Sequence, residues 1–483
     1  MKKKFKLEDK IIIAFVAIIS LILFYCLILN PIIGRADNGD FGRMFALSGL
    51  ADFNENDYSL QYDGFLHQYY IQKYPTILFF WNSDIMSGSF IVKFAVLFNY
   101  FTKWPINGNI FDIRILGFIY SAIFVTGIFL ILKYKRFNLP AKIVAGILIT
   151  LIFTDGVYIA YFNSFFGEAT TISFMFLTIG TFLYLISRKE PRRMDFAIFY
   201  FASVMFLFSK TQETPLIVFM VIIYFALYKF YPQFKKLILK LSIFSVVICA
   251  CVYLSIGVYT NMNNLYQAVF TGILYDSQAP EQDLEELHID PKYAVLAGTA
   301  YDTKNLPYDV EGPEMMTDFY PNVSFVKILK FYLNHPQRLM DKINTSANHA
   351  YEMFRIDDSN FVQGVNHDGK FVNSFRLYLI NRFPDIHRSL FNFIVFSIIY
   401  LGALVYYFFK SKDKEVKLLT LLMLFILAAG DSQLVLPVIG SGYGDFGKHL
   451  FLINISFDIL VCSVIIWATT RVSKFLIKCK IKN

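Results

Sequence analysis

Long apolar segments recur along the chain and limit its possible folds more than any other feature of the sequence. A helix of about 20 apolar residues crosses the hydrocarbon core of a bilayer. Hydropathy predicts about ten such spans. Because 56% of the residues are hydrophobic and only 17% are charged, we expect an all-α polytopic membrane protein. The approximate spans are 11–30, 113–132, 143–160, 169–187, 196–209, 215–231, 237–258, 391–409, 418–435 and 450–470.

Basic residues precede the first span and recur in every second connection between spans. If the spans alternate in direction, all these clusters lie on one side, which the positive-inside rule makes cytoplasmic. We therefore expect a multi-pass protein with both termini in the cytoplasm. The net charge of +8 is explained by these clusters, so no nucleic-acid partner is expected. The clusters lie within 2–10, 133–136, 188–193, 235–240, 410–417 and 471–482.

Two long connections, 31–112 and 259–390, lie on the opposite, outer side of the predicted topology. Connections of this length usually carry function. In the first, residues 90–101 are apolar but too short to span, which favours a helix at the membrane interface. In the second, 325–333 is amphipathic and ends before Pro336, which predicts a helix in a small outer domain. The predicted units are 1–258, which includes the first connection, 259–390, and the C-terminal spans in 391–483.

Charged residues gather at the outward ends of the predicted spans. Burying charge at a membrane boundary is costly, so such groups often mark a functional site. A carboxylate there can act as a general base on a sugar hydroxyl, and grouped carboxylates can hold sugar hydroxyls or a metal. A cation at the same depth can bind a lipid phosphate. The clusters are Asp37, Asp40 and Arg43; Asp155 and Glu168; Lys210 and Glu213; and Asp431, Asp445, Lys448 and His449.

A structural role is an open alternative for each of these residues. Asp37 and Asp40 are suited to pairing with Arg35 and Arg43 in a turn whose glycines supply backbone freedom. The sequence favours a local i,i+3 ion pair between Lys210 and Glu213. The remaining alternatives are a helix cap for Glu168, a solvated boundary position for Asp155, and interfacial positions for Lys448 and His449.

Three motifs resemble those of bacterial hexose transferases of cell-surface glycan assembly, within the GT-C membrane glycosyltransferases. They are Asp37-Asn38-Gly39-Asp40-Phe41-Gly42-Arg43, Tyr161-Phe162-Asn163-Ser164-Phe165-Phe166-Gly167-Glu168 and Asp445-Phe446-Gly447-Lys448-His449. The resemblance extends from the first span to the last. It implies a GT-C-like bundle with juxtamembrane helices in the first outer loop, in the bacterial cell membrane, with an active site that faces outside.

The resemblance further implies an enzyme that transfers a hexose from a polyprenyl-phosphate donor to a surface glycan acceptor, with inversion. On this hypothesis Asp40 is the general base and Asp37 the second candidate. Asp155 and Glu168 would position a sugar. The candidates for the phosphate are Arg43, Lys448 and His449, and Lys210 and Glu213 are further substrate-binding candidates. The compact Asp-x-Asp metal motif of some relatives is absent, so a divalent cation is an open alternative without assigned ligands.

Two other functions remain open. A glycan polymerase or ligase of the same envelope pathways would use basic residues of the second outer loop. A lipid-sugar transporter would place charges near mid-membrane and show repeated halves, whereas here the charges lie at the outer ends and the halves do not match. The basic candidates of that loop are Arg338, Lys342, Arg355, Arg382 and Arg388.

Overall fold

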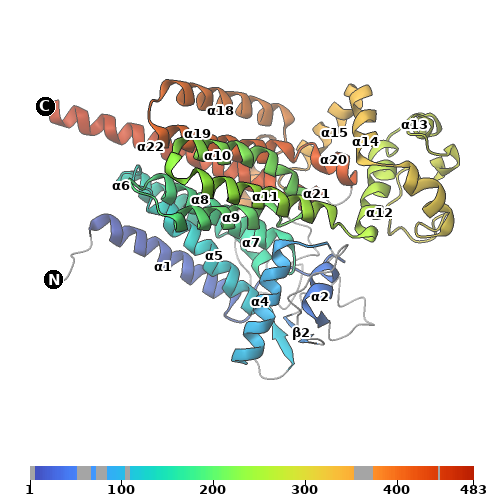
Figure 1. The fold of residues 1–483 in the computed structure, drawn as a ribbon, viewed down its shortest axis with the longest axis horizontal. Helices are drawn as coiled ribbons and strands as arrows, with labels where there is room; N and C mark the ends of the chain where they lie inside the picture. The colour runs from blue at the N-terminus through green and yellow to red at the C-terminus, as the bar shows by residue number, and fades with distance from the viewer. Residues whose placement is uncertain are drawn as a thin grey trace.

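The computed structural model describes residues 6–37, 39–51, 67–71, 84–103, 109–352, 374–443 and 446–482. Figure 1 shows an elongated bundle of helices with both termini toward one end. Within the described residues, seven helices are long and apolar enough to cross a membrane, which confirms the polytopic all-α class. They are α1 (Leu7–Leu27), α5 (Arg114–Leu132), α8 (Gly167–Ile186), η3 with α10 (Thr211–Phe230), η4 with α11 (Pro232–Leu254), α18 (Leu390–Lys410) and α22 (Phe451–Lys482).

The remaining three predicted spans differ from straight crossings for separate reasons. Segment 143–160 forms a broken pair, Leu139–Phe153 and Gly156–Asn163, bent by 64°. Segment 196–209 becomes α9 (Arg193–Leu207), which at 15 residues is short for a crossing. Segment 418–435 becomes α19 (Lys414–Ser432), which has charged residues near both ends. Both α9 and α19 nevertheless pack inside the bundle, α9 on α8 and α19 on α22.

Helix α8 forms the centre of the bundle, and 94% of its apolar window is buried. It packs mainly on α5 and α9. The α5 and α8 backbones approach closely because glycines lie at their contact, and a Cβ on Gly180 would stand 2.5 Å from the Gly127 carbonyl oxygen. Helix α18 lies at the edge, with 11% of its window buried, and packs on α19. The site described below is built around the first turn of α8.

The first long connection contains a small sheet that the sequence did not reveal. Helix α2 (Gly42–Ser48) leads into the three-stranded antiparallel sheet β1-β2-β3, with Leu50 opposite Ile71 and Tyr69 opposite Phe111. Its strands have few residues, and their alternation is correspondingly hard to recognise in the sequence. The strands are β1 (Leu50–Ala51), β2 (Gln68–Ile71) and β3 (Ile110–Asp112).

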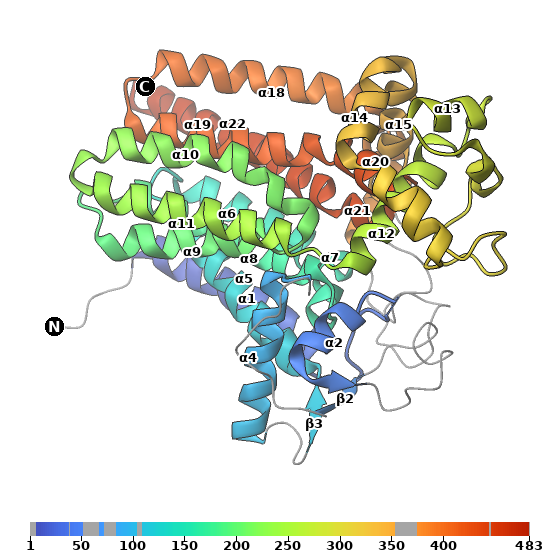
Figure 2. The same cartoon turned by 45° about the vertical axis from the view of Figure 1, so that its right-hand side comes forward.

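The helix predicted over 90–101 is confirmed as α4 (Ser87–Thr102). Figure 2 shows that α4 runs across the direction of the spans. Phe90, Phe94 and Phe101 project from one face of this helix and are exposed. A transverse helix with an exposed aromatic face suits a water–lipid boundary, and that location remains a prediction.

The second long connection is mainly helical in the part that the structure describes. The helix predicted over 325–333 is confirmed as α14 (Phe325–Asn334), which begins where the Ser324 hydroxyl accepts a hydrogen bond from the Lys327 N–H and ends before Pro336. The other elements are α12 (Val258–Gln267), η5 (Ala268–Ile273), α13 (Pro280–Glu286), η6 (Pro291–Leu296), η7 (Met315–Phe319), η8 (Tyr320–Asn322), α15 (Pro336–Asn348), α16 (Phe375–Arg382) and α17 (Pro384–His387).

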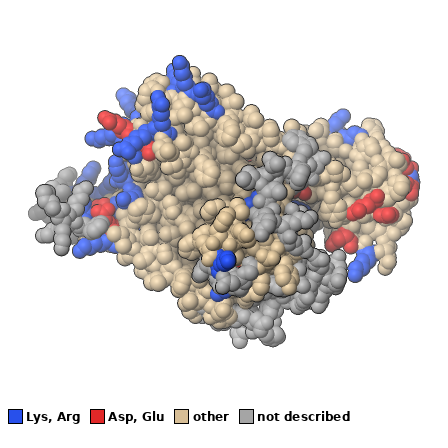
Figure 3. Space-filling view, turned by 60° about the horizontal axis from the view of Figure 1, so that its bottom comes forward, with Lys and Arg blue, Asp and Glu red and all other residues tan. Residues whose placement is uncertain are grey.

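The two ends of the bundle differ in the charge of their side chains. Lys and Arg side chains gather at the end that carries the termini, which we call the basic end (Figure 3). The opposite end, called the site end, carries α2, α12, α20 (Leu436–Ser441) and α21 (Phe446–His449). This separation agrees with the predicted alternation of the spans. Which end faces the cytoplasm remains a prediction from the positive-inside rule.

Candidate active site

The segment that leads into α2 folds around the Asp37 side chain. Asp37 Oδ1 accepts hydrogen bonds from the N–H groups of Gly39, at 2.8 Å, and of Phe41, at 3.0 Å. Gly39 has a φ of 101°, a backbone conformation that glycine adopts without strain. Asp40 then lies with Oδ1 3.1 Å from Arg43 Nη2, and 25% of its side chain is exposed. Asp37 thus holds the turn, whereas Asp40 is accessible to a ligand.

The second motif packs directly against the first. The Phe41 ring meets the rings of Phe165 and Phe166 edge to face, with centroids 5.3 Å and 4.7 Å away. The Asn163 side chain donates to the carbonyl oxygen of Ile33 at 2.8 Å. These contacts use aromatic rings, a backbone carbonyl and the Asn163 amide. They position the loop and leave its charged side chains available for other contacts. The segment between α7 (Gly156–Ile159) and α8 therefore supports the loop that carries Asp40.

The third motif completes the cluster from the far end of the chain. Lys448, in α21, forms an ion pair with Asp40 Oδ2. Its ammonium also lies over the Phe166 ring, 4.9 Å from the centroid. One carboxylate, Asp40, thus lies between two cations, Arg43 and Lys448. Asp445 and Asn38 of these motifs lie outside the described residues.

Beneath this cluster, Glu168 and Lys210 form an ion pair of 2.6 Å between α8 and the start of η3. The prediction of a local ion pair between Lys210 and Glu213 is therefore wrong, because the ion-pair partner of Lys210 is Glu168 of another helix. Lys210 also donates to the carbonyl oxygen of Lys448 at 3.4 Å. A Cβ on Gly167 would stand 2.7 Å from Lys210 Cγ, so glycine permits this close approach. Glu213 is buried and interacts electrostatically with both members of the pair.

His449 makes a reciprocal contact with Gln212 rather than facing the Asp40 cluster. Its Nδ1 lies 2.8 Å from Gln212 Oε1, and the Gln212 amide donates to the His449 carbonyl oxygen at 2.8 Å. Burial lowers the pKa of His449 well below its usual value, and the nearby charges of Lys210, Lys448 and Arg43 lower it further. A neutral imidazole has no positive charge with which to bind a phosphate. The contacts of His449 instead hold η3 against α21.

The two cations beside Asp40 differ in their response to pH. Burial lowers the pKa of Lys448 to about 7, and the charge of Asp37 acts in the opposite direction. Burial also lowers the pKa of Arg43, against the charges of Asp84, Tyr259 and Glu168, but a guanidinium stays protonated at physiological pH. Arg43 is therefore a permanent cation, whereas the charge of Lys448 changes near neutral pH.

Asp155 lies at the break between η1 (Ile149–Phe153) and α7, in a different polar network. Its Oδ1 accepts from the Ser374 hydroxyl at 2.6 Å and from the Val157 N–H at 3.1 Å, and its Oδ2 accepts from the Arg376 N–H at 2.9 Å. Asp431 is likewise bonded elsewhere, to Ser397 of α18 at 2.9 Å. Within the described residues, neither acid forms a hydrogen bond or an ion pair with Asp40, Arg43 or Lys448.

The same network contains a buried ion pair that sequence reasoning missed. Arg376 makes two hydrogen bonds to Asp458 of α22, at 2.9 and 2.6 Å, and the Tyr351 hydroxyl donates to the same carboxylate at 2.9 Å. Tyr351 and Arg376 come from separate parts of the described chain, and both contact α22 through Asp458. The only signal in the sequence was a single acid inside an apolar span, a position that usually has a buried partner.

Asp84 was also missed, and it joins the two long connections. Its carboxylate accepts from the Gly257 N–H at 2.8 Å and from the Thr260 hydroxyl at 2.6 Å, at the start of α12. It acts electrostatically on Arg43 as well. In the part of the chain that the structure describes, His, Cys, Asp and Glu side chains form no group of three or more that could hold a metal ion. The described side chains of the Asp40 cluster are joined by ion pairs.

Comparison with known proteins places the chain in a family. No curated protein and no solved structure gives a significant match. A family model described as the YfdI N-terminal transmembrane domain matches residues 1–483. Since this match covers the whole chain, and since the described helices form a polytopic bundle, the protein belongs to the YfdI N-terminal transmembrane domain family.

Proposed function

We propose that this protein is a membrane-embedded glycosyltransferase of GT-C type, which transfers a hexose from a polyprenyl-phosphate donor to an extracytoplasmic glycan or cell-wall acceptor. The observation that carries the proposal is the position of Asp40 between Arg43 and Lys448 at one end of the bundle. A partly exposed carboxylate with two adjacent cations has the groups that transfer from a phosphate requires.

In the proposed reaction, Asp40 removes the proton from an acceptor hydroxyl. The hydroxyl oxygen bonds to the anomeric carbon, the bond from that carbon to the phosphate oxygen breaks, and its electron pair leaves with the phosphate. Attack opposite to the leaving group inverts the configuration. Arg43 and Lys448 balance the charge that develops on the phosphate. Because both cations pair with Asp40 in the ligand-free protein, phosphate binding would release this carboxylate to act as a base.

The position of this cluster supports a lipid-linked donor. The spans around it expose apolar side chains on the outside of the bundle, as on α10 and α18. The turns at the basic end are short, for example 231–234 between α10 and α11, and give no room for a domain that binds a nucleotide sugar. A donor dissolved in the membrane would present its phosphate at the headgroup level, where we propose that Arg43 and Lys448 lie.

The other residues of the cluster have supporting roles in this proposal. Lys210 donates to the Lys448 carbonyl and is itself held by Glu168, so this pair positions Lys448. Asp37 holds the turn that carries Asp40. We assign no step to a divalent cation, because Arg43 and Lys448 supply the positive charge that such an ion would bring.

The direct test incubates the purified protein in nanodiscs with a panel of polyprenyl-phosphate hexoses. Hydrolysis or transfer of at least one donor is expected, and Asp40→Asn should lower the rate about 100-fold or more, as for the loss of a general base. Asp341→Asn, which changes an exposed acid on α15, is the matched control and should keep the rate. If no donor is bound or turned over, or if Asp40→Asn is fully active, the proposal is wrong.

A glycan polymerase or ligase is the second candidate, and the structure offers less support for it. Two of its basic candidates are paired with acids of their own loop, Arg338 with Asp283 at 2.8 Å and Lys342 with Asp276 at 2.6 Å. Arg355 lies outside the described residues. A mechanism based on these residues would survive Asp40→Asn and would be lost on substitution of Arg338, which separates the two proposals.

A further inference from the structure

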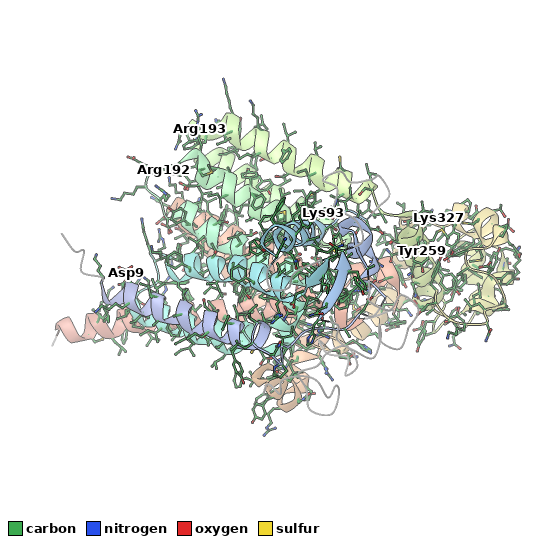
Figure 4. The ribbon with its side chains drawn as sticks, turned by 90° about the horizontal axis from the view of Figure 1, so that it is seen from below. Asp9, Lys93, Arg192, Arg193, Tyr259 and Lys327 are labelled. Carbon is green, nitrogen blue, oxygen red and sulfur yellow. The ribbon has the colours of Figure 1, made fainter. Side chains whose placement is uncertain are left out.

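Tyr259 stands at the junction between the first and second long connections. It lies between Gly257 and Thr260, the two residues that hydrogen-bond to Asp84 of the first connection. Figure 4 shows Tyr259 on α12, where the second connection leaves the bundle. Its position is thus fixed by contacts on both sides in the sequence. Even so, 57% of Tyr259 is exposed.

The Tyr259 ring rests on a packed group of aromatic residues. Its centroid lies 5.4 Å from that of Tyr301, at an interplanar angle of 86°. Tyr301 is only 4% exposed and packs edge to face on Tyr266 at 5.6 Å. The Tyr301 hydroxyl donates to Glu311 Oε1 at 3.2 Å. Tyr259 is therefore an exposed ring that packs on a buried, hydrogen-bonded tyrosine.

The same ring lies within electrostatic reach of the Asp40 cluster. Arg43, which pairs with Asp40 at 3.1 Å, interacts with Tyr259, and so do Glu311 and Asp302 of the second connection. Glu311 and Asp302 are both exposed. An aromatic face, two carboxylates and the partner of the proposed base therefore occupy neighbouring positions at the site end.

These groups match the chemistry of a sugar rather than that of a phosphate. A pyranose ring presents C–H groups that pack on an aromatic face, and its hydroxyls donate to carboxylates. The donor phosphate is drawn to Arg43 and Lys448, whereas Glu311 and Asp302 repel an anion. A ligand on the Tyr259 side should accordingly be rich in hydroxyls and carry no negative charge.

We infer that Tyr259, with Glu311 and Asp302, forms the subsite for the acceptor sugar, and that the acceptor is a neutral glycan. This inference rests on the proposed glycosyl transfer for its biological meaning. It adds a substrate class that the Asp40 cluster alone does not specify. It also gives the second connection a role in recognition, separate from the chemical step at Asp40.

The test compares Tyr259→Ala, Tyr259→Phe and Tyr259→Trp by two measurements. The first is binding of neutral hexose oligosaccharides, with uronic-acid oligosaccharides as the acidic comparison, to the protein without donor. The second is the KM of the acceptor, measured with the KM of the donor and with donor hydrolysis. Tyr378→Ala is the matched control, because Tyr378 is 61% exposed but lies on α16, which packs against η1 and α17.

Tyr259→Ala should weaken binding of neutral oligosaccharides and raise the acceptor KM about threefold to tenfold, the usual value of one aromatic contact. Donor KM and donor hydrolysis should not change, and the Phe and Trp variants should bind as the wild type does. Equal binding by Tyr259→Ala, a parallel loss of donor hydrolysis, the same loss in Tyr378→Ala, or no binding of neutral oligosaccharides by the wild type would overturn the inference. If neutral glycans bind through Tyr259 but no donor is turned over, the proposed function fails and the glycan subsite stands.

Discussion

Lys210 pairs with Glu168 across two helices, at 2.6 Å, and not with Glu213 three residues ahead of it. The pair joins the first turn of α8 to the start of η3, and 12% of the Lys210 side chain and none of the Glu168 side chain is exposed. Because Lys210 also donates to the Lys448 carbonyl, the pair connects the buried core of the bundle to the proposed phosphate site.

The Glu168–Lys210 pair should be a strong stability determinant. Lys210→Met would leave a buried carboxylate without its partner, which costs about 3–5 kcal/mol. We expect a clear fall in the midpoint of thermal unfolding, measured by intrinsic fluorescence in detergent. Glu168→Gln combined with Lys210→Met should recover much of the loss, because no uncompensated charge remains. A single variant as stable as the wild type would contradict this account.

Donor binding should depend on pH through Lys448. A lysine is charged below its pKa and neutral above it, and burial lowers this pKa to about 7. The positive charge that binds phosphate is therefore lost as the pH rises through about 7. We predict that the donor KM increases over this range in the wild type and stays level in Lys448→Arg, since a guanidinium does not deprotonate. Identical pH profiles for the two proteins would exclude Lys448 as the titrating group.

Loss of either partner of the Arg376–Asp458 pair, or replacement of Arg376 by lysine, should destabilise the protein. Arg376 uses two nitrogens on one carboxylate, at 2.9 and 2.6 Å, a geometry that a single ammonium does not reproduce. Asp458→Asn should lower the unfolding midpoint, with a loss of about 3–5 kcal/mol. Arg376→Lys should lower it as well, whereas exposed Arg382→Lys serves as the control. An unfolding midpoint of Arg376→Lys equal to that of the wild type would contradict this prediction and show that a positive charge alone is required.

The predicted orientation places the basic end in the cytoplasm. Cys479 is exposed near the end of α22 and is a natural label for that end. In a Cys251→Ser background, we expect a membrane-impermeant maleimide to label Cys479 only in inside-out vesicles. Asp302→Cys, at the site end, should react only in right-side-out vesicles. The opposite labelling pattern would reverse the topology and place the site in the cytoplasm.

The sequence predicted the features that depend on hydropathy and local periodicity. The straight spans, α4 and α14 were expected close to their observed bounds, because each has enough residues for an apolar or amphipathic pattern to be read. The exception is α22, which continues beyond the predicted end at 470 to Lys482. The alternation of the spans placed Asp40 and Lys448 on the same side of the membrane, but nothing in the spacing of residues so far apart indicates contact. Their mutual position became visible only in the folded chain.

The missed features are set by partners that lie far away in the sequence. Lys210 has a local candidate in Glu213, but packing of η3 on α8 brings it to Glu168 instead. Asp155 and Asp458 look like isolated acids in apolar surroundings, and each finds a partner in Arg376, near the end of the second connection. The β-strands have too few residues to show alternation. Tertiary packing, which no local pattern encodes, decides all of these.

The most direct test of the central claim measures donor binding and sugar transfer separately in Asp40→Asn. If Asp40 is the general base, this variant should bind the polyprenyl-phosphate hexose at least as tightly as the wild type, because Arg43 and Lys448 no longer pair with a carboxylate. Its transfer rate should fall about 100-fold or more. Transfer at the wild-type rate, or a loss of donor binding that fully accounts for the lost activity, would contradict the assignment.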